Sequence, residues 1–196
     1  MDGVRWLDDR EAAAWRGLQN MQMQLNATLA RELAGDSDLS YPDYMVLVAL
    51  TDQPDGRRRP FELGHDLGWE KSRVSHHVTR MVTRGLVTRD TCPSDQRGSF
   101  VVITDRGRAA ITAAAPGHVT AVRRYVIDRL TPAQLDALAE ISDSVVVALA
   151  EAEAEAEDAG EDEAGRAAGT RRNDDSAGAD PRGNGAGADR TNRSER

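Results

Sequence analysis

The chain has 196 residues and a formal net charge of −8, which by itself argues against a nucleic-acid partner. Its single cysteine excludes an intrachain disulfide and fits the reducing cytoplasm. No stretch matches the roughly 18 apolar residues of a membrane span, and the polar, acidic N-terminus lacks the apolar core of a signal peptide. The composition therefore predicts a cytoplasmic protein that does not contact a membrane.

The charge is distributed unevenly along the chain. Residues 56–108 carry 11 basic against 6 acidic side chains, an excess of +5, whereas residues 151–196 carry 7 basic against 13 acidic ones. A local basic surface is what contact with phosphate requires, whatever the total charge. The middle third of the chain is therefore a candidate surface for nucleic acid.

Residues 5–34 are predicted to form one long helix, because apolar side chains recur at steps of three and four residues. A second helix is expected to begin after Ser40, a good N-cap, and to be buried on most sides because Met45 to Leu50 is almost entirely apolar. The apolar positions of the first helix are Trp15, Leu18, Met21, Leu25 and Leu29.

Two shorter helices are predicted next, after a turn written "QPDGRRR". The first covers "PFELGHDLG", and the second covers about residues 70–84 and ends at Gly85. We expect His77 to be a partly buried packing residue of the second helix. The residues expected to face inward are Phe61, Leu63 and Leu67 in the first helix and Val74, Val78, Met81 and Val82 in the second.

Two strands, "LVTRDTCP" and "SFVVITD", are predicted to form a hairpin through the turn "SDQRG". Helix resumes at Asp105 with a possible kink or break at Pro116–Gly117, and a last helix runs from Thr131–Pro132 to about residue 150. Residues 151–196 contain no Leu, Ile, Val, Phe, Tyr or Trp. This acidic, Ala/Gly-rich tail is predicted to be disordered, although its Glu/Ala repeat allows a turn or two of extra helix.

The helix over residues 70–84 has a polar face opposite its apolar stripe. Small hydroxyls, an imidazole and guanidinium groups suit hydrogen bonds to base edges and phosphates. A short helix, a tight link at Gly68 and this polar-faced helix form a helix-turn-helix, and the hairpin makes it winged. Arg97 lies in the hairpin turn, where it suits a narrow minor groove. The candidate DNA-binding residues are Ser72, Arg73, Ser75, His76, Thr79, Arg80 and Arg97.

The run "GLVTRDTCPSDQRGSFVVITDRG" resembles the wing signature of the MarR (multiple-antibiotic-resistance regulator) family. The matching elements are Gly85-Leu86-Val87, Asp95-x-Arg97-Gly98 and Val102-x-Thr104-x-x-Gly107, and the order of predicted helices also matches. The resemblance covers roughly residues 5–150. It implies a mainly α fold with a small β-wing in residues 1–150 and a DNA-binding core at about 40–108, and the tail over 151–196 lies outside it.

The resemblance also implies a homodimer whose N- and C-terminal helices interlock, with one recognition helix per subunit in the major groove and the wing on the minor groove. The expected function is that of a sequence-specific transcriptional regulator, a ligand- or oxidant-responsive repressor on a pseudo-palindromic operator. By position, Asp95 is expected to orient Arg97 through an ion pair. His76 and His77 depart from the Arg or small polar residues common on this helix, so the base preference is left open.

Three features have two interpretations each. Trp6, Trp15 and Arg16 could line a pocket for a small aromatic or phenolic effector, as in relatives, but dimer packing is the interpretation we prefer. Cys92 could sense oxidants, since Arg89 and Arg97 near it would favour the thiolate, but a strand cysteine without a second cysteine is usually inert. The acidic tail could compete with DNA, or it could simply aid solubility.

Other chemistries find little support in the sequence. His76 and His77 are adjacent, so on a helix they point about 100° apart, and no Cys, Glu or His follows at the spacing a metal site needs. No glycine-rich phosphate loop or nucleophile elbow is present, so we expect neither a cofactor nor an enzyme. The alternative function is a winged-helix module that binds protein without specific DNA binding, against which the basic middle third argues.

Overall fold

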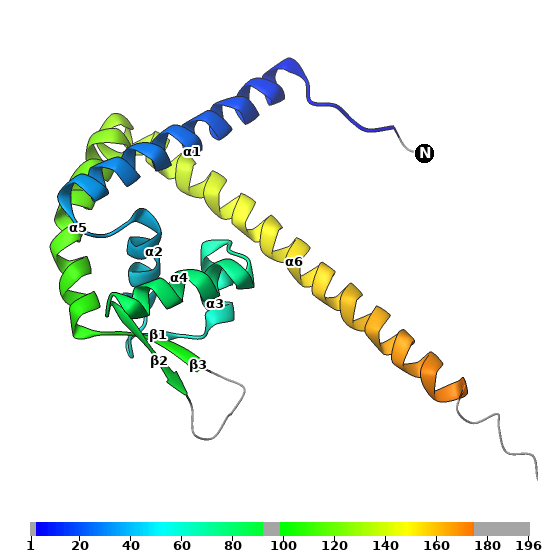
Figure 1. Cartoon of the computed structure of the whole chain (residues 1–196). Coiled ribbons are helices and arrows are strands. Elements are labelled where there is room, and N and C mark those ends of the chain that lie inside the picture. The colour runs from blue at the N-terminus through cyan, green and yellow to red at the C-terminus, as the bar shows by residue number, and fades with distance from the viewer. Residues whose placement is uncertain (1–2, 92–98, 175–196) are drawn as a thin grey trace, which may run out of the picture. The chain divides into compact units, whose positions relative to one another are not determined.

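The computed structural model describes residues 3–91 and 99–174, with side chains described for residues 3–90 and 99–155 (Figure 1). These residues fall into two compact units that divide between Leu135 and Asp136. The first unit holds five α-helices, a 3-10 helix and a small sheet, and the second is formed by helix α6. The predicted fold class, mainly helical with a small wing, is confirmed.

Helix α1 spans Asp9–Asp36 and begins later than residue 5, where the sequence predicted its start. The reason is a capping box at its N-terminus: Asp8 Oδ1 accepts from the Glu11 amide at 2.8 Å, and Glu11 Oε2 accepts from the Asp8 amide at 2.9 Å. Of the predicted apolar stripe only the C-terminal part is covered within this chain. Leu29 is buried, whereas Trp15 and Met21 are about half exposed, at 53% and 49%.

Helix α2 spans Tyr41–Thr51 and confirms the prediction that Ser40 caps it. Ser40 Oγ accepts from the Asp43 amide at 3.2 Å, and Asp43 Oδ2 accepts from the Ser40 amide at 2.9 Å. No residue from Tyr41 to Leu50 is exposed, as the apolar run indicated. The helix is thus the centre of the first unit.

Helices α3 (Pro60–Leu67) and α4 (Lys71–Thr83) form the predicted helix-turn-helix, joined through Gly68 in the left-handed region at φ 61°. The prediction that Phe61 and Val82 face inward is wrong, because these side chains are 70% and 38% exposed. The buried stripe of α4 is narrower than predicted and consists of Val74, His77, Val78 and Met81. His77 takes the inner position that the i, i+3, i+4 spacing assigns to it, as expected of a buried packing residue.

Strands β2 (Val87–Thr91) and β3 (Ser99–Ile103) pair antiparallel, as predicted, with Val87 opposite Ile103. A further strand, β1 (Arg57–Arg58), pairs antiparallel with the other edge of β3 and gives the order β1-β3-β2. The sequence of this segment predicted only a turn. A strand of two residues has no periodicity to detect, and its pairing depends on the edge that β3 offers from far along the chain.

The wing is connected to helix α5 (Asp105–Tyr125) by a close contact between backbones. Thr104 Oγ1 accepts from the Gly107 amide at 3.0 Å as the N-cap, and it lies 2.7 Å and 3.0 Å from the carbonyl oxygens of Gly85 and Leu86, to which it donates. A side chain on Gly107 would place its Cβ 2.1 Å from the Leu86 carbonyl oxygen. These contacts explain why threonine and glycine stand at this spacing.

Helix α5 passes through Pro116 without interruption, so of the kink or break considered at Pro116–Gly117 the break does not occur. A proline removes one backbone hydrogen bond, but α5 packs along both α1 and α2, and this packing holds the helix together. The helix ends instead at Tyr125 and is followed by a 3-10 turn, η1, over Ile127–Arg129.

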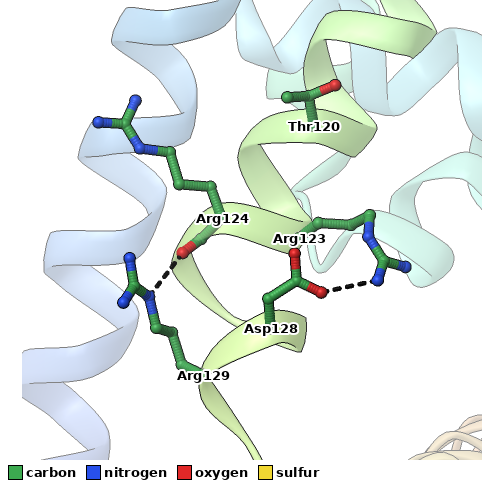
Figure 2. Close-up of a pocket in the computed structure, with 5 residues that line it drawn as sticks. All are labelled: Thr120, Arg123, Arg124, Asp128 and Arg129. Atoms are coloured by element: carbon green, nitrogen blue, oxygen red, sulfur yellow. Dashed lines mark hydrogen bonds and ion pairs between the residues drawn. The ribbon is translucent and has the colours of Figure 1, made fainter.

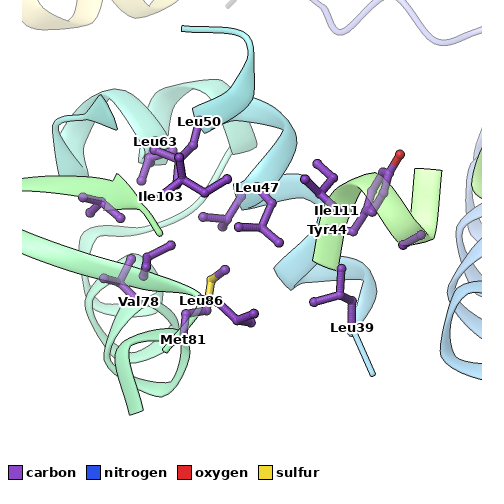
Figure 3. Packing of buried hydrophobic residues seen from close by; sticks show 14 of the residues in the cluster. Leu39, Tyr44, Leu47, Leu50, Leu63, Val78, Met81, Leu86, Ile103 and Ile111 are labelled. Atoms are coloured by element: carbon purple, nitrogen blue, oxygen red, sulfur yellow. The ribbon is translucent and has the colours of Figure 1, made fainter. Parts of the chain in front are cut away.

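The core of the first unit lies between α2, the helix-turn-helix, the sheet and α5 (Figure 3). Leu47, Leu50, Leu63 and Met81 are completely buried in it. Complete burial of such a side chain contributes about 1.5–3 kcal/mol. Because α4 supplies one wall of this core, its opposite face must point away from the unit.

Helix α6 spans Pro132–Asp174, well beyond the predicted end near residue 150. The helix therefore continues through the Glu/Ala repeat as far as Asp174, which is longer than the turn or two of extra helix that the sequence predicted. The physical reason for this length is that Ala and Glu have high helix propensity, so an Ala/Glu repeat can form helix without a core to pack on. Within the part of the chain that the structure describes, no helix has the length and apolar character to cross a membrane.

Candidate nucleic-acid interface

The outer face of α4 carries all six of its predicted DNA-binding residues. Val74, His77, Val78 and Met81 anchor the opposite side of the helix in the core. The rotation of α4 about its own axis is thereby fixed by burial. The residues that this rotation leaves exposed are Ser72, Arg73, Ser75, His76, Thr79 and Arg80.

The first turn of α4 holds Arg73 against an aromatic ring. The Arg73 guanidinium carbon lies 4.4 Å from the centre of the Trp69 ring, and that ring meets the edge of His77 with centroids 5.1 Å apart. Trp69 follows the αL residue Gly68 and thus bridges the turn to the recognition helix. Stacking restricts the long arginine side chain while leaving its N–H groups available at the surface.

Arg89 of strand β2 is a further member of this surface that the sequence analysis did not select. Its Nη2 donates to the Ser75 carbonyl at 3.2 Å and lies 3.1 Å from Thr79 Oγ1, so it spans the middle of the α4 face. In the alternation of β2, Arg89 lies on the same face of the sheet as the buried Val87, and it pairs with the buried Val101 of β3. That position says nothing about which helix the side chain will meet.

A second basic group lies on the other side of the sheet. The guanidinium carbons of Arg57 and Arg59 are 4.6 Å and 4.9 Å from the centre of the Phe100 ring of β3. Arg57 also forms an ion pair with Asp55 at 2.7 Å. The stem of the wing therefore carries arginines on β1 and on β2, on either side of β3.

A buried charge lies beneath this surface. Asp43 is 2% exposed and His77 is 5% exposed, and His77 Nε2 lies 3.1 Å from Asp43 Oδ1, at an angle that does not make a hydrogen bond. Arg84 donates from Nη1 to Asp43 Oδ2 and from Nη2 to the Asp38 carbonyl. Burial by itself raises the pKa of Asp43, but the contacts with His77, Ser40 and Arg84 outweigh it and hold that pKa well below its ordinary value.

Comparison with known proteins decides which family this arrangement represents. The family model described as "MarR family" matches residues 37–98. The transcriptional regulator HosA of Escherichia coli O111:H- is 32% identical over 103 residues, which are 53% of this chain and 73% of HosA. The chain belongs to the MarR family.

Two solved structures of MarR-family transcriptional regulators from Streptomyces coelicolor are similar to this MarR-family chain over 74% of its length. Sco3205, solved in complex with DNA, is 40% identical with a TM-score of 0.70 over 91% of that protein. AbsC is 37% identical, also with a TM-score of 0.70, over 98% of that protein. The resemblance seen in the sequence is thus confirmed, and the protein is a transcriptional regulator rather than an enzyme.

Some of the predicted site residues of this MarR-family regulator lie outside the described residues. Arg97 and Asp95, expected at the wing tip, belong to this group, as does Cys92. Among the described residues no group of three or more His, Cys, Asp or Glu side chains is placed to hold a metal ion.

The three residues predicted to line an effector pocket are all exposed in this chain. Trp6 is 84% exposed, Trp15 is 53% exposed, and Arg16 is also exposed. The hollow shown in Figure 2, with a volume of about 520 Å³, is lined by other residues of the MarR-family fold, at the end of α5 and in η1. These are Thr120, Arg123, Arg124, Asp128 and Arg129, of which Arg123 and Asp128 form an ion pair at 2.7 Å.

Proposed function

We propose that this MarR-family regulator is a repressor that binds a pseudo-palindromic operator as a homodimer. The exposed face of α4 would enter the major groove, and the wing would contact the neighbouring minor groove. An effector or an oxidant would release the operator by changing the separation of the two recognition helices.

The observation that carries this proposal is the division of α4 into two faces. Four side chains fix one face in the core, and the six polar side chains opposite are all exposed. Hydroxyls, an imidazole and guanidinium groups on one exposed helix face match the donor and acceptor pattern of base edges and phosphates. Sco3205, 40% identical, was solved in complex with DNA, which supports the same use here.

The homodimer is supported by apolar side chains that this chain alone leaves uncovered. On α1 and just before it, Trp6, Trp15 and Met23 are 84%, 53% and 64% exposed. On α6, Ile141 and Val145 are 59% and 50% exposed. An isologous pairing would cover both helices, and it also explains Trp6 and Trp15 without an effector pocket.

Two-fold symmetry sets the form of the operator. The two copies of α4 would lie about one turn of DNA apart, ~34–36 Å, and would read half-sites that repeat with inverted orientation. A conformational change in the dimer that altered this distance would break the match at both half-sites together. That is how a small molecule acting at the dimer helices would control binding at the wing and α4.

Selection of bound duplexes from a random library tests the proposal. We expect the recovered sequences to share two inverted half-sites whose centres are about 10 base pairs apart. Light scattering on the free protein should give the mass of a dimer. Recovery of unrelated sequences, by a protein that is monomeric at micromolar concentration, would instead favour a protein-binding module.

A further inference from the structure

We propose that Asp43 and His77 are positioning residues for DNA binding, because they hold the guanidinium group of Arg80 in place on the face of α4. This inference rests on the proposed function, since it assumes that Arg80 meets the duplex. Neither Asp43 nor His77 can touch DNA itself, because they are 2% and 5% exposed. Their effect would be exerted through Arg80, which is exposed.

The contact that connects the buried pair to the surface runs through the imidazole ring. Arg80 Nη2 lies 2.9 Å from His77 Nδ1, and His77 Nε2 on the other side of the ring lies 3.1 Å from Asp43 Oδ1. The ring therefore stands between a guanidinium at the surface and a carboxylate in the core. Its edge contact with Trp69 fixes the plane of the ring.

The chemistry of the two partners determines where the proton of His77 lies. An arginine has only donors, so Nδ1 must be the acceptor in the contact with Arg80. The proton of a neutral imidazole is then on Nε2, where it faces the carboxylate of Asp43. This tautomer accepts from Arg80 and places the protonated Nε2 3.1 Å from the Asp43 carboxylate as an electrostatic contact, whereas the opposite tautomer would place two donors against each other at Nδ1.

Asp43 is itself rigidly held, which makes it a suitable anchor. Its Oδ2 accepts from the Ser40 amide at the start of α2 and from Arg84 at the end of α4. The carboxylate therefore connects the N-cap of α2 with both Arg80 and Arg84 of the recognition helix. Any shift of α2 relative to α4 would be transmitted to the guanidinium of Arg80.

Pre-positioning matters because a free arginine side chain has many rotamers. Fixing such a side chain on binding costs conformational entropy. The contact with His77 uses one N–H group of Arg80 and leaves the rest of its five donors for the duplex. Removing the acceptor at His77 should therefore weaken DNA binding even though His77 does not touch DNA.

Two substitutions separate the two sides of the ring. In His77→Asn the amide oxygen can replace the acceptor Nδ1, so Arg80 stays held while the contact with Asp43 is lost. In His77→Gln the amide nitrogen can replace the donor Nε2, so Asp43 keeps its partner while Arg80 is released. Both variants lose the same ring contact with Trp69, so each is the control for the other.

The affinity of each full-length variant is measured by fluorescence anisotropy with the duplex recovered from the random library. We expect His77→Gln to bind roughly tenfold more weakly, about as weakly as Arg80→Ala, and His77→Asn to stay within about threefold of the unmodified protein. In the Arg80→Ala background, His77→Gln should have no further effect. Equal affinities for the Asn and Gln variants, or additive losses, would overturn the inference.

A measurement on the unmodified protein covers the case in which a variant does not fold. The ¹⁵N chemical shifts of the His77 ring should show a neutral imidazole protonated at Nε2. A proton on Nδ1 would contradict the positioning role. If the unmodified protein binds no duplex, the proposed function itself fails; if it binds but Arg80→Ala binds equally well, only this inference fails.

Discussion

Asp43 shows how much a single side chain can depend on its partners. The carboxylate is buried, and burial alone would favour its protonated form. Contacts from His77, Ser40 and Arg84 reverse that preference and lower its pKa. A carboxylate held in this way stabilises the fold as long as it remains ionised. If a partner is removed, the uncompensated buried charge destabilises the fold.

The first prediction concerns acid stability. Because the pKa of Asp43 in the folded protein is below the ordinary value of 3.8, its contribution is complete above that value and is lost as the pH falls below about 4. Asp43→Asn should reduce the free energy of unfolding at pH 7 by about 3 kcal/mol and flatten its dependence on pH in the acid range. Urea unfolding between pH 7 and pH 3 measures both effects, and Asp136→Asn, at an exposed site, is the control.

The second prediction concerns the exposed arginines. Arg73, stacked on Trp69, and Arg97 are expected to contact phosphates, so each alanine variant should bind roughly tenfold more weakly. Loss of one phosphate contact should also reduce the slope of affinity against salt concentration by about one. A gel-shift series over salt is the measurement, with Arg123→Ala on α5 as the control of equal charge. Binding like that of the unmodified protein by both variants would contradict the assignment of this face.

Secondary-structure elements in this fold are joined by a few close backbone contacts. The link between α4, the wing and α5 depends on Thr104, whose hydroxyl caps α5 and donates back to the segment after α4. Gly107 allows that segment to approach, because a Cβ there would lie 2.1 Å from the Leu86 carbonyl oxygen. This contact sets the direction in which the wing leaves the helix-turn-helix.

A third prediction tests this junction. Thr104→Ala removes the cap and the bonds to the preceding turn, and should lower the free energy of unfolding by about 2 kcal/mol, while Thr104→Ser should keep most of it. Gly107→Ala should destabilise the protein at least as much, because backbone must move to make room. Denaturant unfolding of the three variants is the measurement. Stability of Gly107→Ala equal to that of the unmodified protein would show that the approach is not required.

The proposed dimer would cover apolar surface that one chain leaves exposed. Ile141, Val145 and Leu149 repeat at four-residue steps on α6 and are 59%, 50% and 60% exposed. Exposed apolar side chains in such a regular row indicate a partner helix. A dimer would also double the DNA contacts, because two weakly binding α4 helices become one tightly binding pair.

A fourth prediction follows for the dimer. Introducing charge with Ile141→Asp and Val145→Asp should give a monomer in light scattering at about 10 µM and abolish binding to the selected duplex. Val147→Asp with Ala150→Asp adds the same charge at exposed positions on the opposite side of the helix, since successive residues are about 100° apart around its axis. That control should remain dimeric. If the Ile141→Asp, Val145→Asp variant remained dimeric, the dimer interface would have to lie at other residues.

The sequence by itself determined the features that depend on near neighbours. The cap at Ser40, the two helices around Gly68, the two wing strands and the outward face of α4 follow from periodicity and capping within a few residues. The motif at Thr104 and Gly107 indicated the family before its structural reason was visible. Local patterns were sufficient because each of these features is stabilised within one helix or hairpin.

Only the tertiary structure decided what depends on residues far apart in the chain. The strand β1, the exposure of Phe61 and Val82, and the continuity of α5 through Pro116 are set by packing against other elements. The contacts of Asp43 with His77 and Arg84 join side chains that are far apart in the sequence, 41 residues in the case of Arg84. No local pattern predicts such contacts. A buried charge is tolerated only where its partners converge, and convergence is a property of the folded chain.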